Sequence, residues 1–372
     1  MAETIYQLEG QAEIPSPNLV YYLDLISKNA DQAMTIAGSP DRLWPHVKSH
    51  KMESMVKFLQ DKGINRFKTA TIAETEMVLA CRPKAVLMSY PLVGQNIPRF
   101  IELAKRATTT QLWATGDHYG QLKQLSDLAL AKGLTINLLV DVNMGMNRTG
   151  VPMDQAGSFY RRCLDLTGLR LDGLHCYDGH RNDRDYATRL ERVTETDQQI
   201  KKIQEELESE NIACSTIVAG GTPSFPCHAQ VSDFYLSPGT LFLYDYNYKK
   251  SFPDLDFTPA ACLVTRVISH TAPDLFTLDL GSKAIATDLQ GVRGVILNLE
   301  DKAVPLFQSE EHWVFQIKEE HRHLLPEVGS IHYVIPTHIC STTALYPEVL
   351  LAQGGKLVGS WQVTARNRYL SV

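Results

Sequence analysis

The chain has 372 residues, and its 36 lysines and arginines against 42 aspartates and glutamates give a formal net charge of −6. This mild acidity supplies no overall field that would attract nucleic acid or an anionic membrane surface. A hydrophobic content of 44% with 21% charged residues is ordinary globular composition and excludes extended disorder. No apolar run approaches the roughly 20 residues that span a bilayer.

The first residues and the cysteines both predict a cytoplasmic protein. The opening sequence MAETIYQ lacks the basic and then apolar stretches of a secretory signal. The 7 cysteines are scattered singly, without a C-x-x-C pair, which is typical of reduced thiols rather than of a disulfide framework.

Short apolar runs alternate with helical patterns over the first two thirds of the chain. Strands are predicted at residues 19–23, 45–48, 66–69, 85–89, 111–114, 135–142, 169–176, 215–219 and 234–236. Helices are predicted at residues 53–61, 72–80, 97–105, 119–132, 154–166 and 186–210. This alternation is typical of parallel βαβ units, and the strand count predicts a (β/α)8 TIM barrel over residues 16–246 with one flanking strand.

The pattern changes after Tyr248. Strand-like runs bounded by Pro, Gly and Asp follow one another without long helices, at residues 263–269, 276–279, 292–299, 313–317 and 331–336. They predict a separate C-terminal antiparallel β domain over residues 257–372, joined by a linker at 247–256. Residues 1–15 are expected to form an N-terminal segment that pairs with this domain, with a strand over residues 3–9.

The first reactive strand end is residues 45–51, PHVKSHK. Catalytic groups of a parallel barrel sit at the carboxyl ends of its strands. A lysine there, beside His46 and His50, is typical of an amine that forms a Schiff base with an aldehyde. Lys48 is the candidate, and the alternative is a solvated basic turn.

Two later strand ends carry further candidates. The predicted strand at 135–142 runs into a glycine-containing turn with Arg148, whose guanidinium can reach an oxygen anion. After the strand at 169–176, Tyr177 could pack against a ring cofactor and His180 could act on a substrate. The alternatives are an ordinary polar loop and satisfied core side chains.

Two glycine turns follow the last two strands before the linker. They contain Gly221 with Thr222, and Gly239 with Thr240. Backbone N–H groups and hydroxyls at adjacent strand ends are what a phosphate requires, and phosphate sites of barrels commonly follow strands seven and eight. Because Walker and G-x-G-x-x-G motifs are absent, a phosphorylated cofactor smaller than a nucleotide is favoured over a nucleotide. A pair of ordinary glycine turns is the alternative.

A possible metal site lies in the β domain, where His338 and Cys340 stand two residues apart. On a strand, this spacing places both side chains on one face. Zinc accepts both ligand types, and two protein ligands leave positions open for water or substrate. A buried histidine and a buried cysteine without a metal are the alternative.

Taken together, these residues resemble the fold-type III pyridoxal-phosphate enzymes, and more narrowly the group of D-threonine aldolase and D-serine dehydratase, relatives of alanine racemase. The resemblance covers nearly the whole chain. It begins at residues 17–24, continues through residues 45–51 and 70–74, and ends at His338 and Cys340. The Pro-His-x-Lys-x-His-Lys pattern followed far downstream by His-x-Cys is specific as a pair.

The resemblance implies roles for these residues. Lys48 would hold pyridoxal 5′-phosphate as a Schiff base, Arg148 would lie near its phenolic oxygen, and His46 and Tyr177 would be cofactor-binding. The residues implied for the phosphate are Gly221, Thr222, Gly239 and Thr240. His338 and Cys340 would bind a divalent metal, zinc first, with manganese or magnesium as alternatives. One departure is Ser237, which stands where alanine racemases have an arginine that contacts the pyridine nitrogen.

The implied activity is that of a lyase for D-β-hydroxy-amino acids. The D-threonine aldolase reaction, retro-aldol cleavage to glycine and an aldehyde, is favoured, with His180 or a water on the metal as the base. The alternative is dehydration of D-serine or D-3-hydroxyaspartate, in which Lys48 removes the α-proton. Further alternatives are an amino-acid racemase and a non-catalytic pyridoxal-phosphate-binding protein, although the β domain argues against the latter. By the same resemblance, we expect a homodimer.

Overall fold

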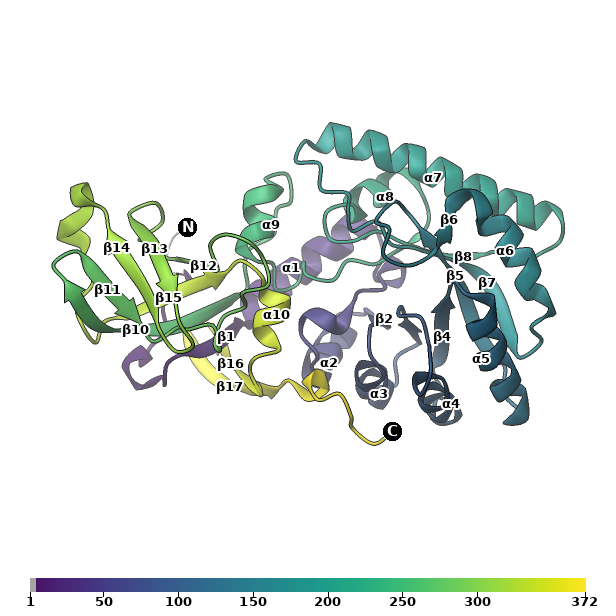
Figure 1. Ribbon diagram of the computed structural model, residues 1–372, viewed down its shortest axis with the longest axis horizontal. Helices are drawn as coiled ribbons and strands as arrows, with labels where there is room; N and C mark the ends of the chain where they lie inside the picture. The colour runs from purple at the N-terminus through teal and green to yellow at the C-terminus, as the bar shows by residue number, and fades with distance from the viewer. Residues whose placement is uncertain (1–4) are drawn as a thin grey trace. The chain divides into compact units, whose positions relative to one another are not determined.

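The structure, a computed structural model, describes residues 5–372 and consists of two compact units (Figure 1). The first, called here the α/β unit, comprises Ala33–Gly239 together with Thr364–Val372. The second, called the β unit, comprises residues 5–32 together with Thr240–Val363. Helix α1 (Leu23–Ala37) contains the point at which the chain passes from one unit to the other.

The α/β unit is built on a parallel sheet with the strand order β2-β3-β4-β5-β7-β8-β9, and the short β6 pairs with β5. The strands are β2 (Arg66–Thr69), β3 (Ala85–Met88), β4 (Gln111–Gly116), β5 (Ile136–Asn143), β6 (Val151–Pro152), β7 (Leu169–Cys176), β8 (Thr216–Ala219) and β9 (Tyr235–Leu236). Every residue of β3 and of β8 is buried. Continuous apolar runs of this kind are what a parallel sheet covered by helices requires.

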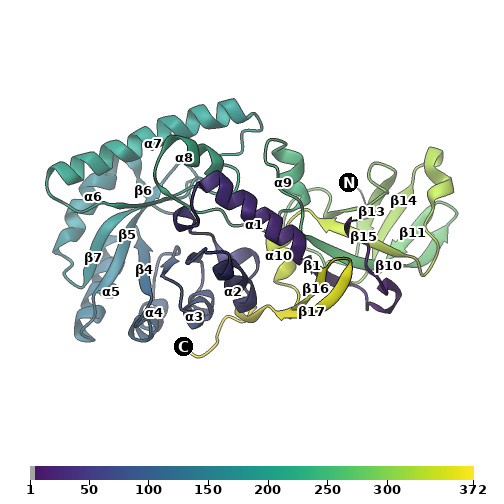
Figure 2. The same cartoon turned by 180° about the vertical axis from the view of Figure 1, so that it is seen from behind.

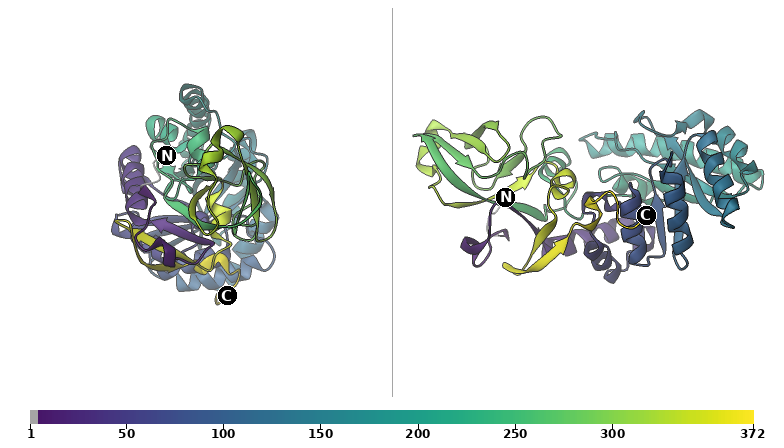
Figure 3. Two further views of the ribbon diagram at one scale, coloured as in Figure 1. Left: turned by 90° about the vertical axis from the view of Figure 1, so that its left-hand side faces the viewer. Right: turned by 60° about the horizontal axis from the view of Figure 1, so that its bottom comes forward.

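The helices of this unit follow the strands. They are α2 (Glu53–Asp61), α3 (Ile72–Ala80), α4 (Asn96–Arg106), α5 (Tyr119–Ala131), α6 (Ala156–Arg162), α7 (Tyr186–Ser209) and α8 (Phe225–Val231). The long teal helix α7 runs along the outer edge of this unit in Figures 1 and 2, and Figure 3 turns the same ribbon to two further views. Helix α3 begins after Thr71, whose side chain accepts a hydrogen bond from the Glu74 N–H and so satisfies a free donor of the first turn.

The prediction of a closed eight-stranded barrel was wrong, because the sheet is open between β2 and β9. Residues 45–48 form no strand; a 3-10 helix, Val47–Ser49, occupies their end. Before it, Leu43 and His46 make only isolated parallel bridges to the two edge strands. Pro45 has no N–H to donate, which prevents a continuous ladder here.

The β unit contains a nine-stranded mixed sheet rather than the predicted antiparallel one. Its main path is β13-β14-β11-β10-β1-β16-β17, and β15 pairs with β10 and β12. The strands are β1 (Asn18–Tyr22), β10 (Ala261–Ala272), β11 (Leu275–Leu278), β12 (Gly294–Ile296), β13 (Ala303–Gln308), β14 (Trp313–Ile317), β15 (Ile331–Pro336), β16 (Glu348–Gln353) and β17 (Lys356–Gln362). Strand β1, which was predicted within the barrel region of residues 16–246, lies instead between β10 and β16 and runs parallel to β16.

The N-terminal segment packs into the β unit without forming the predicted strand. Residues 3 and 4 lie outside the described residues, and residues 5–9 are not extended strand. Tyr6, Leu8 and Ile14 belong to the same buried apolar cluster as Val20 and Cys262. Burial of apolar side chains therefore holds this segment in place.

Two short helices complete the β unit. Helix α9 (Tyr246–Ser251) occupies part of the predicted linker, and α10 (Ile339–Thr343) follows β15. Between residues 5 and 372, no helix is long and apolar enough to cross a membrane.

Candidate active site

The loop that carries Lys48 is held by its own backbone contacts. His46 Nδ1 accepts a hydrogen bond of 3.2 Å from the Lys48 N–H and caps the 3-10 helix. Burial, together with the charge of Lys48, lowers the pKa of His46 well below its usual range, so the ring is a neutral acceptor. Lys51 forms an ion pair with Glu74, whose carboxylate also accepts the Ala70 N–H at 2.7 Å. These contacts tie the lysine loop to the end of β2.

A cavity of about 570 Å³ opens beside Lys48 in the α/β unit. Its lining includes His46, Lys48, Lys68, Arg148, His175 and Tyr177. The structure thus brings together four residues that the sequence predicted separately around a cofactor.

The Tyr177 ring is the centre of a cluster of cations. Its centroid lies 5.6 Å from Lys48 Nζ, 5.2 Å from Lys68 Nζ and 5.1 Å from the Arg148 guanidinium carbon. Within residues 5–372, no carboxylate forms an ion pair with any of these three cations. Lys68 is buried and Lys48 half-buried, whereas Arg148 is exposed, so positive charge gathered without a carboxylate is most costly at Lys68. The pocket therefore suits a ligand that carries anionic oxygens, as pyridoxal phosphate does.

Lys68 was not predicted as a site residue. It lies on β2 with its side chain buried, and its Nζ is 3.5 Å from His175 Nε2. His175 Nδ1 is in turn 2.7 Å from Asp141 Oδ1. Burial and the charge of Lys48 lower the pKa of Lys68 to about 7. A lysine between two buried residues of a parallel strand was the available signal, because buried lysines are rare.

The shifted pKa of Lys68 predicts a pH-dependent gain in stability for Lys68→Met. An unfolded chain keeps this proton up to a pKa of about 10.4. The folded protein is therefore penalised fully below pH 7, and the penalty falls as the pH rises toward 10. We expect the variant to stabilise the cofactor-free protein by roughly 2–4 kcal/mol at pH 6 and by far less at pH 10. Urea unfolding at both pH values measures this, and an equal gain at both would contradict it.

The two predicted glycine turns lie side by side at the ends of β8 and β9. The Ser237 N–H donates to the carbonyl of Ala219 at 2.9 Å, and the Gly239 N–H donates to the Thr222 hydroxyl at 3.3 Å. The buried Ser237 hydroxyl has no hydrogen-bond partner among the described residues. Such an atom is expected to meet a ligand or an ordered water.

Both turns approach the pocket too closely for larger residues. A Cβ atom at Gly221 would lie 3.2 Å from the Tyr177 ring, and one at Gly239 would lie 3.2 Å from the Cβ of His46. Glycine is the residue that permits such close backbone approach. Thr240 is the first residue of the β unit after this turn, and its hydroxyl lies 3.4 Å from the Cys340 sulfur.

His180 is not among the residues that line the cavity in the described chain. Its Nδ1 is buried without a hydrogen-bond partner, and a Cβ atom at Gly145 would lie 2.9 Å from its Nε2. Burial, followed by the charge of Arg181, lowers the pKa of His180. The ring is therefore neutral at pH 7 and able to accept a proton.

His338 and Cys340 do not share the face of a strand as predicted. Strand β15 ends at Pro336, His338 is the residue before helix α10, and Cys340 lies in its first turn. The two side chains are nevertheless close enough for Cys340 to raise the pKa of His338. The first turn of a helix brings them together instead of the pleat of a strand.

The surroundings of His338 fit a metal ligand. Its Nδ1 lies 2.6 Å from Asp288 Oδ2, which leaves Nε2 available. Metal-binding histidines commonly donate their second N–H to a carboxylate in this way. Burial lowers the pKa of His338, but Cys340 and Asp288 raise it to about 9. From residue 5 onward, no group of three or more His, Cys, Asp or Glu side chains is arranged to hold a metal, so this pair would supply two ligands.

Comparison with known proteins finds a matching family for each of two regions of the chain. The family described as the alanine racemase N-terminal domain matches residues 22–246, and the serine dehydratase domain family matches residues 260–352. The chain is 26% identical to the D-threonine aldolase of Arthrobacter sp. over 370 residues, covering 95% of this chain and 93% of that protein. It is 24% identical to the 3-hydroxy-D-aspartate aldolase of Paracoccus denitrificans over 372 residues, covering 96% and 94%.

A solved structure shows the same fold over the same length. The crystal structure of the D-threonine aldolase from Filomicrobium marinum matches with a TM-score of 0.86 at 27% identity, covering 95% of this chain and 96% of that one. The cation-lined cavity beside Lys48 lies within the matched alanine racemase region. The chain therefore belongs to the alanine racemase N-terminal domain family of fold-type III pyridoxal-phosphate proteins.

Proposed function

We propose that this protein is a pyridoxal-phosphate- and metal-dependent lyase that cleaves D-β-hydroxy-amino acids to glycine and an aldehyde, in the manner of D-threonine aldolase. The observation that carries the proposal is the group of three cations around the Tyr177 ring, none of them paired with a carboxylate within residues 5–372. Similarity to two aldolases along almost the whole chain supports it.

Pyridoxal phosphate, when bound, would withdraw electrons from the α-carbon of an attached amino acid, and a divalent metal would lower the pKa of a hydroxyl bound to it. In this proposal Lys48 carries the amine that joins the cofactor aldehyde. Arg148 and Lys68 neutralise anionic oxygens of the bound groups, and Tyr177 supports the ring. Ser237 offers a hydroxyl with no other partner in the described structure.

The phosphate group would be held by the two glycine turns. The Thr222 hydroxyl, now an acceptor for the Gly239 N–H, can turn toward a phosphate and free that N–H to donate as well. Gly221 and Thr240 complete the proposed set. The close packing of Gly221 on Tyr177 and of Gly239 on His46 supports this placement because it links the turns to the pocket lining.

His338 Nε2 and the Cys340 sulfur would hold the metal, for which zinc is the best match to nitrogen and sulfur ligands. Manganese and magnesium are alternatives. His180 is the proposed base for the β-hydroxyl proton, since its ring is neutral and Nδ1 has no partner among the described residues. Free cysteines throughout the described chain support a reducing, cytoplasmic setting, and the family resemblance supports a homodimer.

A dehydratase of D-serine or D-3-hydroxyaspartate is the second candidate. The match of residues 260–352 to the serine dehydratase domain family favours it. In this version Lys48 removes the α-proton, the β-hydroxyl leaves, and the products are a keto acid and ammonia.

Product analysis tests both candidates. The purified protein, reconstituted with pyridoxal phosphate and zinc, is incubated with D-threonine and with D-serine, with and without a chelator. We expect acetaldehyde and glycine from D-threonine, and loss of both with chelator. Pyruvate or 2-oxobutyrate with ammonia would establish the dehydratase instead. The L-isomer as the sole product would contradict both and identify a racemase.

A further inference from the structure

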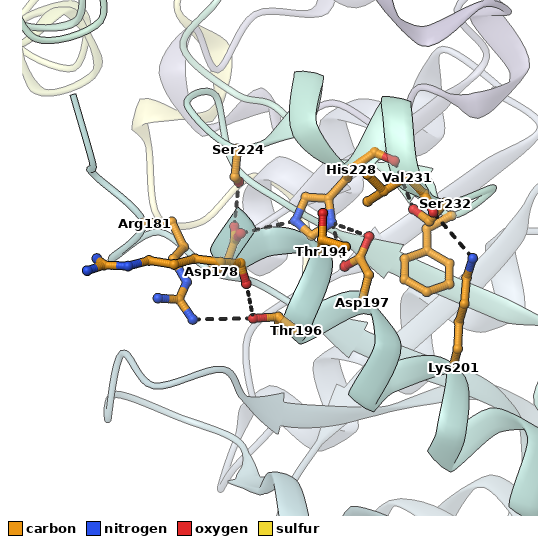
Figure 4. Close-up of polar contacts among 12 residues, drawn as sticks. Asp178, Arg181, Thr194, Thr196, Asp197, Lys201, Ser224, His228, Val231 and Ser232 are labelled. Carbon is orange, nitrogen blue, oxygen red and sulfur yellow. Dashed lines mark hydrogen bonds and ion pairs between the residues drawn. The ribbon is translucent and has the colours of Figure 1, made fainter. Parts of the chain in front are cut away.

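A second group of ionisable side chains lies buried behind the glycine turn of residues 220–224. His228 on α8 lies between Asp197 on α7 and Asp178, which follows β7 (Figure 4). Its Nδ1 is 3.0 Å from Asp197 Oδ2, and its Nε2 is 3.0 Å from Asp178 Oδ2. The side chain of His228 is 0% exposed and those of both aspartates are 2% exposed. None of the three lines the cavity beside Lys48.

The geometry defines the charge of the histidine. Ionised carboxylates only accept hydrogen bonds, so both ring nitrogens of His228 must carry a proton to satisfy Asp178 and Asp197. Burial opposes the charge, but the two aspartates raise the pKa of His228 to about 10. The group is therefore an imidazolium held between two carboxylates throughout the physiological pH range.

Hydrogen bonds continue from this cluster into the turn. The Ser224 hydroxyl donates to Asp178 Oδ1 at 2.7 Å and accepts the Gly221 N–H at 3.0 Å. The line of contacts runs from Asp197 through His228 and Asp178 to Ser224, as the dashed lines of Figure 4 show. A Cβ atom at Gly220 would lie 2.9 Å from the imidazole Cδ2, so the turn rests directly on the His228 ring.

Stability alone is a weak reason for such a cluster. Replacing buried ion networks by apolar side chains of similar volume is often neutral or stabilising, because burying charges is costly. Buried polar networks instead specify one conformation. Here the network fixes the direction of the Gly221 N–H and joins the turn to Asp178, the neighbour of Tyr177. It thereby holds both the turn and the aromatic wall of the pocket.

We propose that His228 is a positioning residue: clamped by Asp178 and Asp197, it fixes the turn of residues 220–224 in the shape that receives a phosphate. The inference rests on the proposed function, because it assumes that this turn binds the cofactor phosphate. Under this proposal, residues that do not touch the cofactor determine the preference for its phosphorylated form.

Binding to the cofactor-free protein tests the inference without any turnover. Absorbance titrations compare the Kd of pyridoxal phosphate with that of pyridoxal, which lacks the phosphate, for the wild type, His228→Gln and Ser224→Ala. The preference is the ratio of the Kd of pyridoxal to the Kd of pyridoxal phosphate. We expect this ratio to fall at least about tenfold in each variant, while the Kd of pyridoxal changes by less than about threefold. A tenfold fall in this ratio corresponds to about 1.4 kcal/mol of binding free energy lost from the interaction with the phosphate.

A matched control separates positioning from general weakening. Val193→Ala truncates a buried side chain on α7 outside the cluster and should keep the wild-type preference. If His228→Gln fails to fold, Ser224→Ala still breaks the link between Asp178 and Gly221 and remains decisive. An unchanged preference, or equal losses for both ligands, would overturn the inference. A wild-type protein that binds neither ligand would overturn the proposed function itself.

Discussion

Replacing Lys48 with alanine is expected to remove both the visible absorption of bound pyridoxal phosphate and the cleavage of D-threonine. Lys48 supplies the proposed amine for covalent attachment, and the 3-10 helix Val47–Ser49 holds it in the lining of the cavity. Loss of a covalent contact should lower kcat/KM by at least about 10³-fold, or roughly 4 kcal/mol of transition-state stabilisation. Absorption spectra and product assays of the reconstituted variant measure the two effects separately.

Lys57→Ala is the matched control for this experiment. The Lys57 side chain is 58% exposed on α2, where it pairs with Glu53 one turn away. Surface substitutions of this kind usually change stability by less than about 0.5 kcal/mol, so both signals should be kept. Retained absorption together with retained turnover in Lys48→Ala would contradict the proposed role of Lys48.

Removing either proposed metal ligand should lower the activity strongly but, unlike Lys48→Ala, should leave the absorption of the bound cofactor intact. We expect His338→Ala and Cys340→Ala to lower D-threonine cleavage by at least about 10²-fold, because a metal that activates a hydroxyl contributes several kcal/mol. The visible absorption should stay unchanged, since neither side chain lines the cavity beside Lys48 in the described structure. Metal content by plasma emission spectroscopy and product assays measure the effect.

The control for the metal variants is His323→Ala, which removes an exposed histidine of the β unit from a different segment. It should bind metal and cleave D-threonine like the wild type. Chelation of the wild-type protein should reproduce the loss, and zinc should restore it. Full activity of metal-free protein would exclude the proposed role of His338 and Cys340.

The spacing of apolar residues within a segment correctly predicted several helices and strands of the α/β unit. The predicted helices at residues 53–61 and 72–80 are confirmed as α2 and α3 with those bounds, because their apolar spacing and, for α3, the Thr71 cap are encoded within the segment. The strand at residues 66–69 is likewise confirmed as β2. Residues 45–48 were misassigned because their proline prevents a ladder, which a purely apolar reading of the segment overlooks.

Long-range pairing explains most of what the sequence did not predict. Strand β1 reads like any other short apolar strand, and only its partners β10 and β16 place it in the β unit. His338 and Cys340 were predicted as a pair, but on a strand rather than at the start of α10, since their spacing of two fits either structure.

Part of the candidate site could be proposed from residues that follow predicted strands. Arg148 and Tyr177 follow β5 and β7, and parallel topology brings the carboxyl ends of such strands together. Lys48 lines the same cavity, although the segment before it forms no strand. Lys68 lines the same cavity from β2, and its place within a predicted strand was an unused signal of its burial. His228 is recognisable only once its neighbours are known, because its two aspartate partners lie 31 and 50 positions away.

The most direct test is to locate the covalent attachment of the cofactor. The protein reconstituted with pyridoxal phosphate is reduced with borohydride and digested, and the labelled peptide is identified by mass spectrometry. The proposed function predicts one label on the Lys48 side chain. A label on Lys68 or on any other lysine, or no label at all, would contradict it.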